Sequence, residues 1–177
     1  MRFVDLLKTT VMLSGAAATM LAVVTVVGAT HDRDDTLVLI ATGWWIAAAI
    51  IGAALGRRSQ VTAPIGRLLA DAKQATMLPE HRPGAVILNR LWPLLASTVA
   101  AGAIGFIFAQ VPAVACGFAI IWSLAWRRQD SAVLAVEERD GVTYYVERTS
   151  PIRPMQLVRT PGLRREVPTL TSVNGTR

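Results

Sequence analysis

The sequence predicts an all-α integral membrane protein with four transmembrane helices, arranged as two in–out–in hairpins, and a small cytoplasmic β-hairpin near the C-terminus. The 177-residue chain is 53% hydrophobic and only 17% charged, whereas soluble domains carry roughly 25% charged residues. Its apolar residues gather in long uncharged blocks, and its basic residues gather between these blocks. We therefore expect a transmembrane domain over residues 1–128, a cytoplasmic β-hairpin element over 129–160 and a disordered tail over 161–177.

The first two uncharged blocks, residues 9–30 and 36–56, contain 22 and 21 residues. A helix needs about 20 apolar residues to cross a bilayer, so each block predicts one span. The first block also resembles a signal peptide, because Arg2 and Lys8 precede it and Val27-Gly28-Ala29 ends it. Its apolar stretch exceeds the usual length of about 7–15 residues, which favours a retained helix.

The third uncharged block, residues 91–126, contains 36 residues. A single helix of this length would measure roughly 54 Å, far more than the hydrocarbon core of about 30 Å. Pro112 lies near the middle, removes a backbone donor and disfavours helix at the preceding residue. We expect two spans, over 91–109 and 113–126, joined by a tight turn; a partly re-entrant block is the open alternative.

The basic residues indicate the orientation of these spans. Two lie before the first block, six lie between the second and third, and nine follow the third, while Arg33 stands alone in the short 31–35 turn. Cytoplasmic loops carry the excess of Lys and Arg. If the third block is a hairpin, this rule places both termini in the cytoplasm, and we expect a multi-pass protein of the cell (plasma) membrane. The net charge of +6 then reflects orientation, and we expect no nucleic-acid partner. The excess of Arg over Lys is typical of a GC-rich bacterial genome.

Residues 62–78 predict an amphipathic helix between the second and third blocks. Thr62 is a suitable N-cap, Pro64 suits the first turn, and Pro79 ends the pattern. A basic amphipathic helix next to a span favours the inner leaflet, so we expect the bilayer and its anionic lipids as partners. Docking on a protein partner or on the C-terminal tail is the alternative.

After Asp130 the pattern changes to strands. Residues 133–138 and 142–148 flank Arg139-Asp140-Gly141, and Asp-Gly is a strong signal for a two-residue hairpin turn. Residues 155–159 predict a third strand. Because an isolated hairpin is marginal in water, we expect residues 131–160 to bind a protein partner or a second copy of the chain.

Three groups of residues are candidates for sites. Small residues at intervals of four predict close helix packing within the chain, with dimerisation as the alternative: Ala48, Gly52, Gly56, Ala101 and Gly105. Two adjacent tryptophans, Trp44 and Trp45, lie too deep for an interfacial belt and predict bundle packing or the wall of an outward-facing pocket. The predicted cytoplasmic interaction surface consists of Arg67, Lys73, Tyr144 and Tyr145.

The chain lacks the common chemical signatures. It contains no phosphate-binding glycine loop, no GxSxG and no HExxH, and its single Cys116 excludes an intrachain disulfide. We expect no catalytic residue, metal or cofactor. The leading hypothesis is a non-enzymatic accessory or interaction subunit; the alternative is a small transporter or channel subunit for a neutral or apolar solute. An enzyme that uses His81 or Glu137 ranks last.

Overall fold

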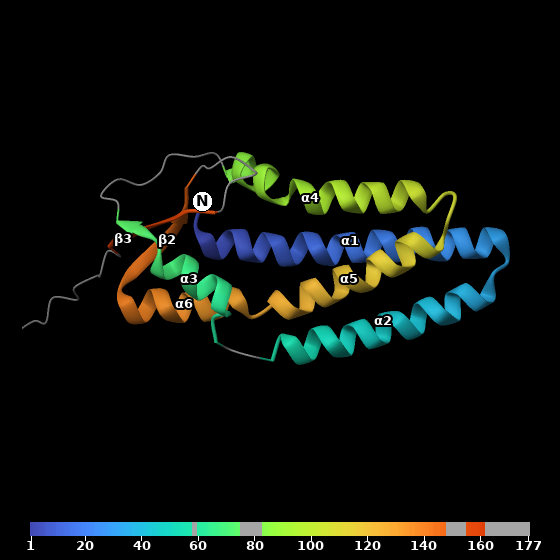
Figure 1. The fold of residues 1–177 in the computed structure, drawn as a ribbon, viewed down its shortest axis with the longest axis horizontal. Helices are drawn as coiled ribbons and strands as arrows, with labels where there is room; N and C mark the ends of the chain where they lie inside the picture. Colours follow the sequence, from blue (N-terminus) through green and yellow to red (C-terminus); the bar gives the residue numbers. More distant parts are fainter. Residues whose placement is uncertain (58–59, 75–82, 148–154, 162–177) are drawn as a thin grey trace, which may run out of the picture.

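The computed structural model describes residues 1–57, 60–74, 83–147 and 155–161, and its helices and strands separate into two parts (Figure 1). A bundle contains the four longest helices: α1 (Phe3–Asp32), α2 (Asp35–Leu55), α4 (Pro83–Ile104) and α5 (Gln110–Trp126). The remaining elements gather at one end: α3 (Ala63–Ala70), β1 (Lys73–Gln74), α6 (Gln129–Asp140), β2 (Val142–Val146) and β3 (Leu157–Pro161). We call this second group, together with the first two turns of α1, the cap.

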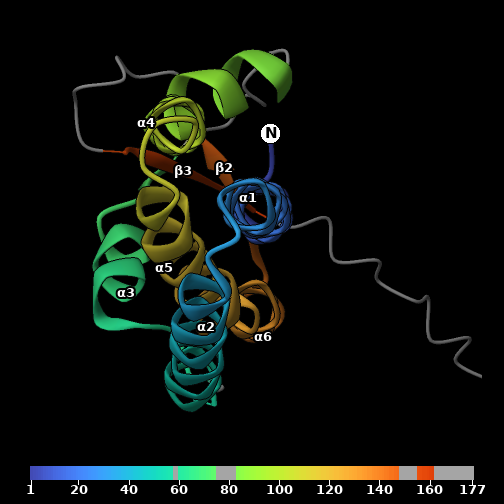
Figure 2. The same cartoon turned by 90° about the vertical axis from the view of Figure 1, so that its right-hand side faces the viewer.

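Helix α5 lies at the centre of the bundle. It packs most extensively on α1 and α2, while α4 lies along α1 on the opposite side from α2 (Figures 1 and 2). Three helices, α1, α2 and α4, are long and apolar enough to cross a membrane, with mean hydropathies of 2.0, 2.1 and 1.3. Helix α5 has 17 residues. The structure therefore confirms apolar helices of membrane-spanning length, and the fourth span remains a prediction.

The third apolar block is broken, but one turn earlier than expected. Helix α4 ends at Ile104 and α5 begins at Gln110, so the predicted turn at residues 110–112 is wrong. Pro112 instead occupies the first turn of α5, where the missing N–H costs nothing because no helical carbonyl precedes it. Helix α4 also begins at Pro83 rather than near residue 91, which places Pro93 in its interior.

The connections α1–α2 and α4–α5 meet at the end of the bundle away from the cap (Figure 1). Ala29, Leu37 and Ala109 form a small buried cluster there. The carboxylate of Asp34 accepts a hydrogen bond of 3.0 Å from the N–H of Leu37 and so caps α2. The acidic turn at residues 31–35 therefore supplies the N-cap of α2.

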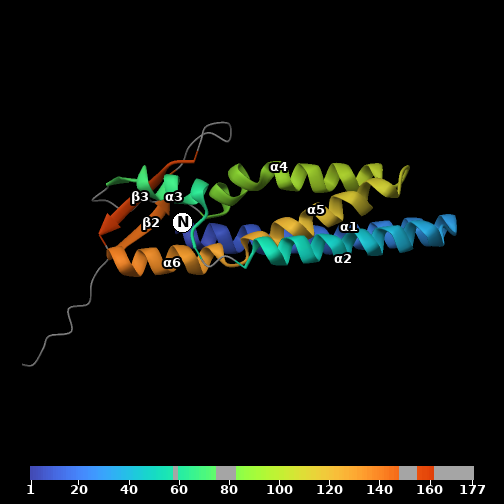
Figure 3. The same ribbon diagram turned by 60° about the horizontal axis from the view of Figure 1, so that its bottom comes forward.

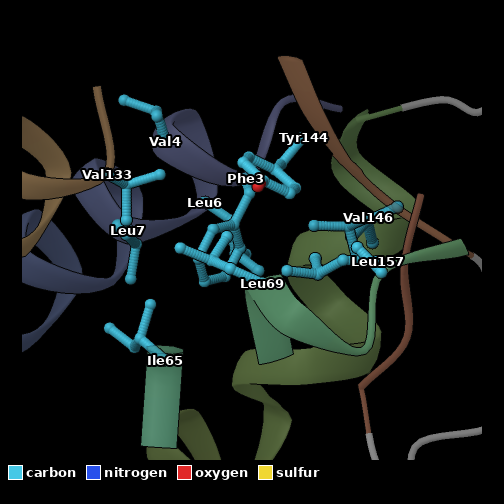
Figure 4. Packing of buried hydrophobic residues seen from close by; sticks show 12 residues of the cluster. Phe3, Val4, Leu6, Leu7, Ile65, Leu69, Val133, Tyr144, Val146 and Leu157 are labelled. Carbon is cyan, nitrogen blue, oxygen red and sulfur yellow. The ribbon is translucent and has the colours of Figure 1, made fainter. Parts of the chain in front are cut away.

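The cap has its own hydrophobic core, shown in Figure 4. Helix α1 begins at Phe3, six residues before the predicted span, because apolar residues recur from residue 3 to residue 7 at helical spacing. These residues precede the apolar block and reach into the cap, where they meet side chains from α3, α6, the sheet and the first turn of α4. The buried core consists of Phe3, Val4, Leu6, Leu7, Ile65, Leu69, Ala72, Val86, Val133, Tyr144, Val146 and Leu157.

A three-stranded sheet with the order β1-β3-β2 covers this core (Figure 3). Strand β2 pairs with β3 in antiparallel fashion, with Tyr144 opposite Arg159, and β1 pairs with β3 in parallel. At the other edge of β2, the N–H of Val146 donates to the carbonyl of Met1 at 3.1 Å. The start of the chain therefore extends the sheet before α1 begins.

The predicted strand over residues 133–138 is wrong, because these residues lie in α6. The pattern failed at Gly141, which has a φ of 63° and ends α6 in the left-handed conformation. Asp-Gly suits a hairpin turn, but glycine is equally the preferred residue after a helix C-terminus. The actual hairpin is β2–β3, so the predicted third strand exists, over Leu157–Pro161.

The amphipathic helix is shorter than predicted. Helix α3 ends at Ala70, and Lys73–Gln74 form β1 because the edge of β3 offers backbone partners; residues 75–78 lie outside the described part of the chain. Thr62 precedes α3 as predicted but makes no side-chain cap. Its N–H donates instead to the side-chain oxygen of the buried Gln129, at 3.1 Å, which ties α3 to α6.

Candidate functional site

A cavity of about 670 Å³ lies at the junction of the bundle and the cap. Its walls come from four helices, and Met155 contributes from the segment before β3. The residues that line it are Phe3, Leu6, Leu7, Thr10, Pro64, Ile65, Leu68, Arg90, Leu91, Pro93, Leu94, Ser97, Trp122, Trp126 and Met155. We call this the junction cavity.

The junction cavity is apolar except near one cation. Arg90 lines it, and no acidic residue does so within the described ranges. The two hydroxyls in its wall are engaged with their own helices: Thr10 donates to the carbonyl of Leu6 at 2.8 Å, and Ser97 donates to that of Leu94 at 3.0 Å. The described lining of the cavity is therefore mostly apolar, with Arg90 as its one cation.

A second cavity of about 310 Å³ continues the first one along α4 and α5. The two share Leu94, Ser97 and Trp122, and the second also reaches Leu21 and Phe118. Trp122 is 50% exposed and Phe118 is 60% exposed, so the space is open to the side of the bundle. We call the two cavities together the groove.

Sequence reasoning missed most of this site. Leu6 and Leu7 precede the first uncharged block, and Arg90 stands immediately before the third. The rule that spans begin where charges stop excluded these residues from the helices. The available signal was the helical spacing of apolar residues upstream of Lys8.

The structure places the two residues of the predicted pocket wall, Trp44 and Trp45, in different environments. Trp44 lines a cavity of about 350 Å³ between α2 and the start of α5, together with Asp34 and Gln110. Its indole N–H donates to the carbonyl of Val114 at 3.3 Å. Trp45 does not line this cavity; it packs against the core of the bundle and donates to the carbonyl of Ala113 at 2.9 Å.

The predicted packing residues lie at helix contacts. A Cβ added to Gly52 would lie 2.9 Å from the Cβ of Leu124 on α5, and one added to Gly56 would meet the backbone of the same residue. Gly105 lies close to Pro112 and to Val24 of α1. Ala48 is fully buried, and Ala101 belongs to a buried cluster with Ala18, Leu21 and Cys116.

The predicted interaction surface is only partly a surface. Arg67 and Lys73 are exposed, and Tyr145 is half-buried. Tyr144 is 4% exposed and belongs to the core of the cap, so the prediction that it forms part of the interaction surface is wrong. The alternation in β2 turns Tyr144 and Val146 towards α1, and burial raises the pKa of the Tyr144 hydroxyl.

Glu137 joins three elements of the cap. One of its oxygens accepts from the Arg2 guanidinium at 2.7 Å, and the other accepts from the N–H of Tyr144 at 2.9 Å. The carboxylate is 5% exposed, and its hydrogen bond raises the pKa of Arg2. Both acceptor oxygens are thus engaged in structure, which gives Glu137 a role that needs no substrate.

We expect Glu137→Ala to lower the stability of the cap by about 2 kcal/mol, because a hydrogen bond to a charged group is worth roughly 1.5–3 kcal/mol. Arg2 is 44% exposed and regains water, so the loss stays below that of a fully buried ion pair. Hydrogen exchange at the Tyr144 amide measures the change. The exposed neighbour supplies the control: Glu138→Ala should leave exchange unchanged, and equal losses in the two variants would contradict the assigned role.

Metal-binding geometry is absent from the part of the chain that the structure describes: no three His, Cys, Asp or Glu side chains come together. His81 lies outside the described residues. Comparison with protein-family models, curated proteins and solved structures finds no match to this chain. The function must therefore be inferred from the geometry alone.

Proposed function

We propose that the chain is a four-span protein of the cell membrane whose cytoplasmic cap acts as a non-enzymatic interaction subunit. The observation that carries the proposal is the construction of the cap around the start of α1, with Phe3 only 2% exposed. A module built on the first turns of a membrane helix is held at a fixed position at the bilayer surface. Such a module is better suited to binding another protein than to catalysing a reaction.

The observation that supports a protein partner is not the one on which the sequence-based prediction rests. The predicted hairpin needed an external surface for its apolar face, but β2 and β3 bury that face on α1 and α3. What remains exposed is β1, at the edge of the sheet among the described strands, with Lys73 on it and Arg67 on the preceding helix. An exposed strand edge can accept a further strand, and its two cations favour an acidic partner segment.

Site-specific photo-cross-linking in cells tests the proposed function. A photoreactive residue at Lys73 should give a discrete cross-linked product, whereas one at Glu138, on α6, should not. Exchanging the charge with Arg67→Glu should remove the product. A product pattern that is the same at both positions, or that is unchanged by Arg67→Glu, would contradict a docking surface at β1.

The orientation is tested by cysteine labelling. Asp32 and Asp71 are both exposed, whereas the native Cys116 is only 1% exposed. A thiol reagent should therefore label a cysteine introduced at position 32 or 71 and leave Cys116 unlabelled. Asp32→Cys should react with an impermeant reagent outside the cell, and Asp71→Cys should react only after lysis. The opposite pattern would place the cap outside.

The cavity beside Trp44 favours a second candidate, a subunit that moves a neutral or apolar solute. The cavity has a volume of about 350 Å³ and lies at the end of the bundle away from the cap. Purified protein in liposomes should then transport a solute, and Trp44→Ala should change the rate. Absence of flux across a broad panel of solutes would remove this candidate.

A further inference from the structure

We infer that the cavity beside Trp44 binds a monovalent organic cation, with the cationic group at Asp34 and an apolar body that reaches Trp44. This cavity of about 350 Å³ lies at the end of the bundle away from the cap, where the α1–α2 and α4–α5 connections meet (Figure 1). The inference goes beyond the proposed docking function and does not depend on it. It concerns binding alone, and its ligand is charged, so it also differs from the transport of a neutral solute.

One face of α2 forms the long wall of the cavity. Asp34, Leu37, Ala41 and Trp44 line it at intervals of three and four residues, which places them on one side of the helix. This wall measures roughly 15 Å at 1.5 Å per residue. Val114 contributes to the facing wall, on α5. The cavity is therefore elongated, and its volume lies at the lower end of the range of about 300–1,000 Å³ that is usual for small-molecule sites.

Polar and apolar residues lie at opposite ends of this cavity. Its polar lining residues come from the starts of α2 and α5, at the end of the bundle away from the cap: Asp34, Thr36 and Gln110. The lining residues further along α2, from Leu37 to Trp44, are apolar or aromatic. An elongated ligand with one polar end therefore fits with that end at the connections and its apolar body towards the middle of the bundle.

The ring of Trp44 is held in place as an apolar wall. It lies directly against Gly117 of α5, where an added Cβ would collide with the indole. The ring also makes an edge-to-face contact with Phe118, and the two ring centroids are 5.7 Å apart. Because the indole N–H already donates to the carbonyl of Val114 at 3.3 Å, Trp44 offers a ligand its ring surface rather than a hydrogen bond. Such a surface favours an alkyl or aryl body.

The carboxylate of Asp34 can bind a cationic group while it caps α2. Its Oδ1 accepts from the N–H of Leu37 at 3.0 Å, whereas its Oδ2 has no hydrogen bond or ion pair among the described residues. Both oxygens of an ionised carboxylate are acceptors, and a charged donor makes the stronger hydrogen bond to them. An ammonium group can therefore bind Oδ2 and leave the helix cap intact.

The charges around the cavity favour a cation, and their arrangement favours an organic one. The 31–35 turn contains three Asp and one Arg, a net charge of −2 with its histidine neutral, and the 105–109 connection contains no charged residue. A surface of one sign raises the local concentration of ligands of the opposite sign. A metal ion needs several converging ligands, and nowhere in the described ranges do three His, Cys, Asp or Glu side chains come together. One carboxylate beside an apolar wall matches a single positive charge on an apolar body.

Isothermal titration calorimetry of the full-length protein in detergent micelles tests the site, with protein-free micelles as the blank. The probe is phenylbutylammonium, and phenylbutanol is the uncharged compound of the same length. Phenylbutylammonium should bind saturably as one molecule and about tenfold more tightly than phenylbutanol, because the alcohol lacks the charge-assisted contact with the carboxylate.

Asp34→Asn removes the charge and keeps the cap, since Asn and Asp are about equally good N-cap residues. It should lower the affinity for phenylbutylammonium about tenfold and leave that for phenylbutanol unchanged. Asp35→Asn is the matched control, because Asp35 belongs to the same turn, is exposed and does not line the cavity; it should bind both compounds as the wild type does. Val114→Phe fills the cavity from a position that is 50% exposed, so it should lower the affinity for both compounds.

The inference is overturned if the wild-type protein binds neither compound, if Asp34→Asn keeps its affinity for phenylbutylammonium, or if Asp35→Asn loses as much affinity as Asp34→Asn. Normal binding by Val114→Phe would also overturn it, because the ligand would then lie elsewhere. Equal binding of the two compounds that Val114→Phe abolishes would assign the cavity to neutral solutes instead. If Asp34→Asn fails to fold, the comparison of the two compounds and Val114→Phe still decide. Loss of the cross-link at Lys73 with intact binding of phenylbutylammonium would remove the docking function alone, and the converse would remove this site alone.

Discussion

Replacing Phe3 by alanine is expected to unfold the cap while the bundle remains helical. Phe3 is 2% exposed and is among the largest fully buried side chains of the described residues. Truncating a buried phenylalanine costs about 3–5 kcal/mol, since the apolar surface is lost and a cavity remains. The expected local loss, about 3–4 kcal/mol, is a large fraction of the stability of a module of this size.

Hydrogen exchange measures this loss where it should occur. The amides of Tyr144 and Val146 in β2 should lose protection, while those in the centres of α1 and α5 should keep it. Phe106→Ala is the control, because Phe106 is 88% exposed in the α4–α5 connection and contributes to neither core. If protection in α5 fell together with that in β2, the cap and the bundle would unfold as one cooperative unit, and the cap would have no stability of its own.

The apolar helices could be predicted from the sequence because their signal is long and simple. A run of about 20 uncharged residues allows few structures in a bilayer, so the sequence predicts α2 to within one residue at each end. It predicts the existence of α1 and α4 as well, but it places their starts six and eight residues too late. The cap is different, since its elements are short and their patterns are ambiguous. Residues 129–140 contain valines that suggest a strand, but they also contain alanines and glutamates that favour helix, and their contacts with α1 decide the outcome.

The candidate site could be predicted only in part, for a similar reason. The alternation of side chains along β2 can be read from the sequence. Which of its two faces is buried cannot, because the surface that buries Tyr144 comes from residues 3–7 at the other end of the chain. The groove likewise combines α1, α3, α4 and α5. Such a site follows from the packing of helices that are far apart in sequence, and no local pattern encodes it.

Gly52→Leu is expected to separate α2 from α5 and to lower the stability of the bundle by about 3 kcal/mol. A Cβ at this position would lie 2.9 Å from the Cβ of Leu124 and 3.0 Å from the Cα of Ile121, so backbone and side chain would both have to move. Overpacking of a tight contact costs typically 1–3 kcal/mol, and the upper value applies where backbone blocks the new atom. Membrane helices associate through such close approaches, which a larger residue prevents.

Gly43→Leu is the matched control on the same helix, because a Cβ at Gly43 meets nothing within 4 Å. Leucine is a better helix former than glycine by up to about 1 kcal/mol, so this variant should be neutral or slightly more stable. Unfolding in mixed micelles with increasing sodium dodecyl sulfate, followed by tryptophan fluorescence, measures both variants. The Gly52 face is occupied by α5 of the same chain, so Gly52→Leu should change this unfolding midpoint and leave the oligomeric state as it was. A variant that folds normally but loses a dimer would show instead that Gly52 faces a second copy of the chain.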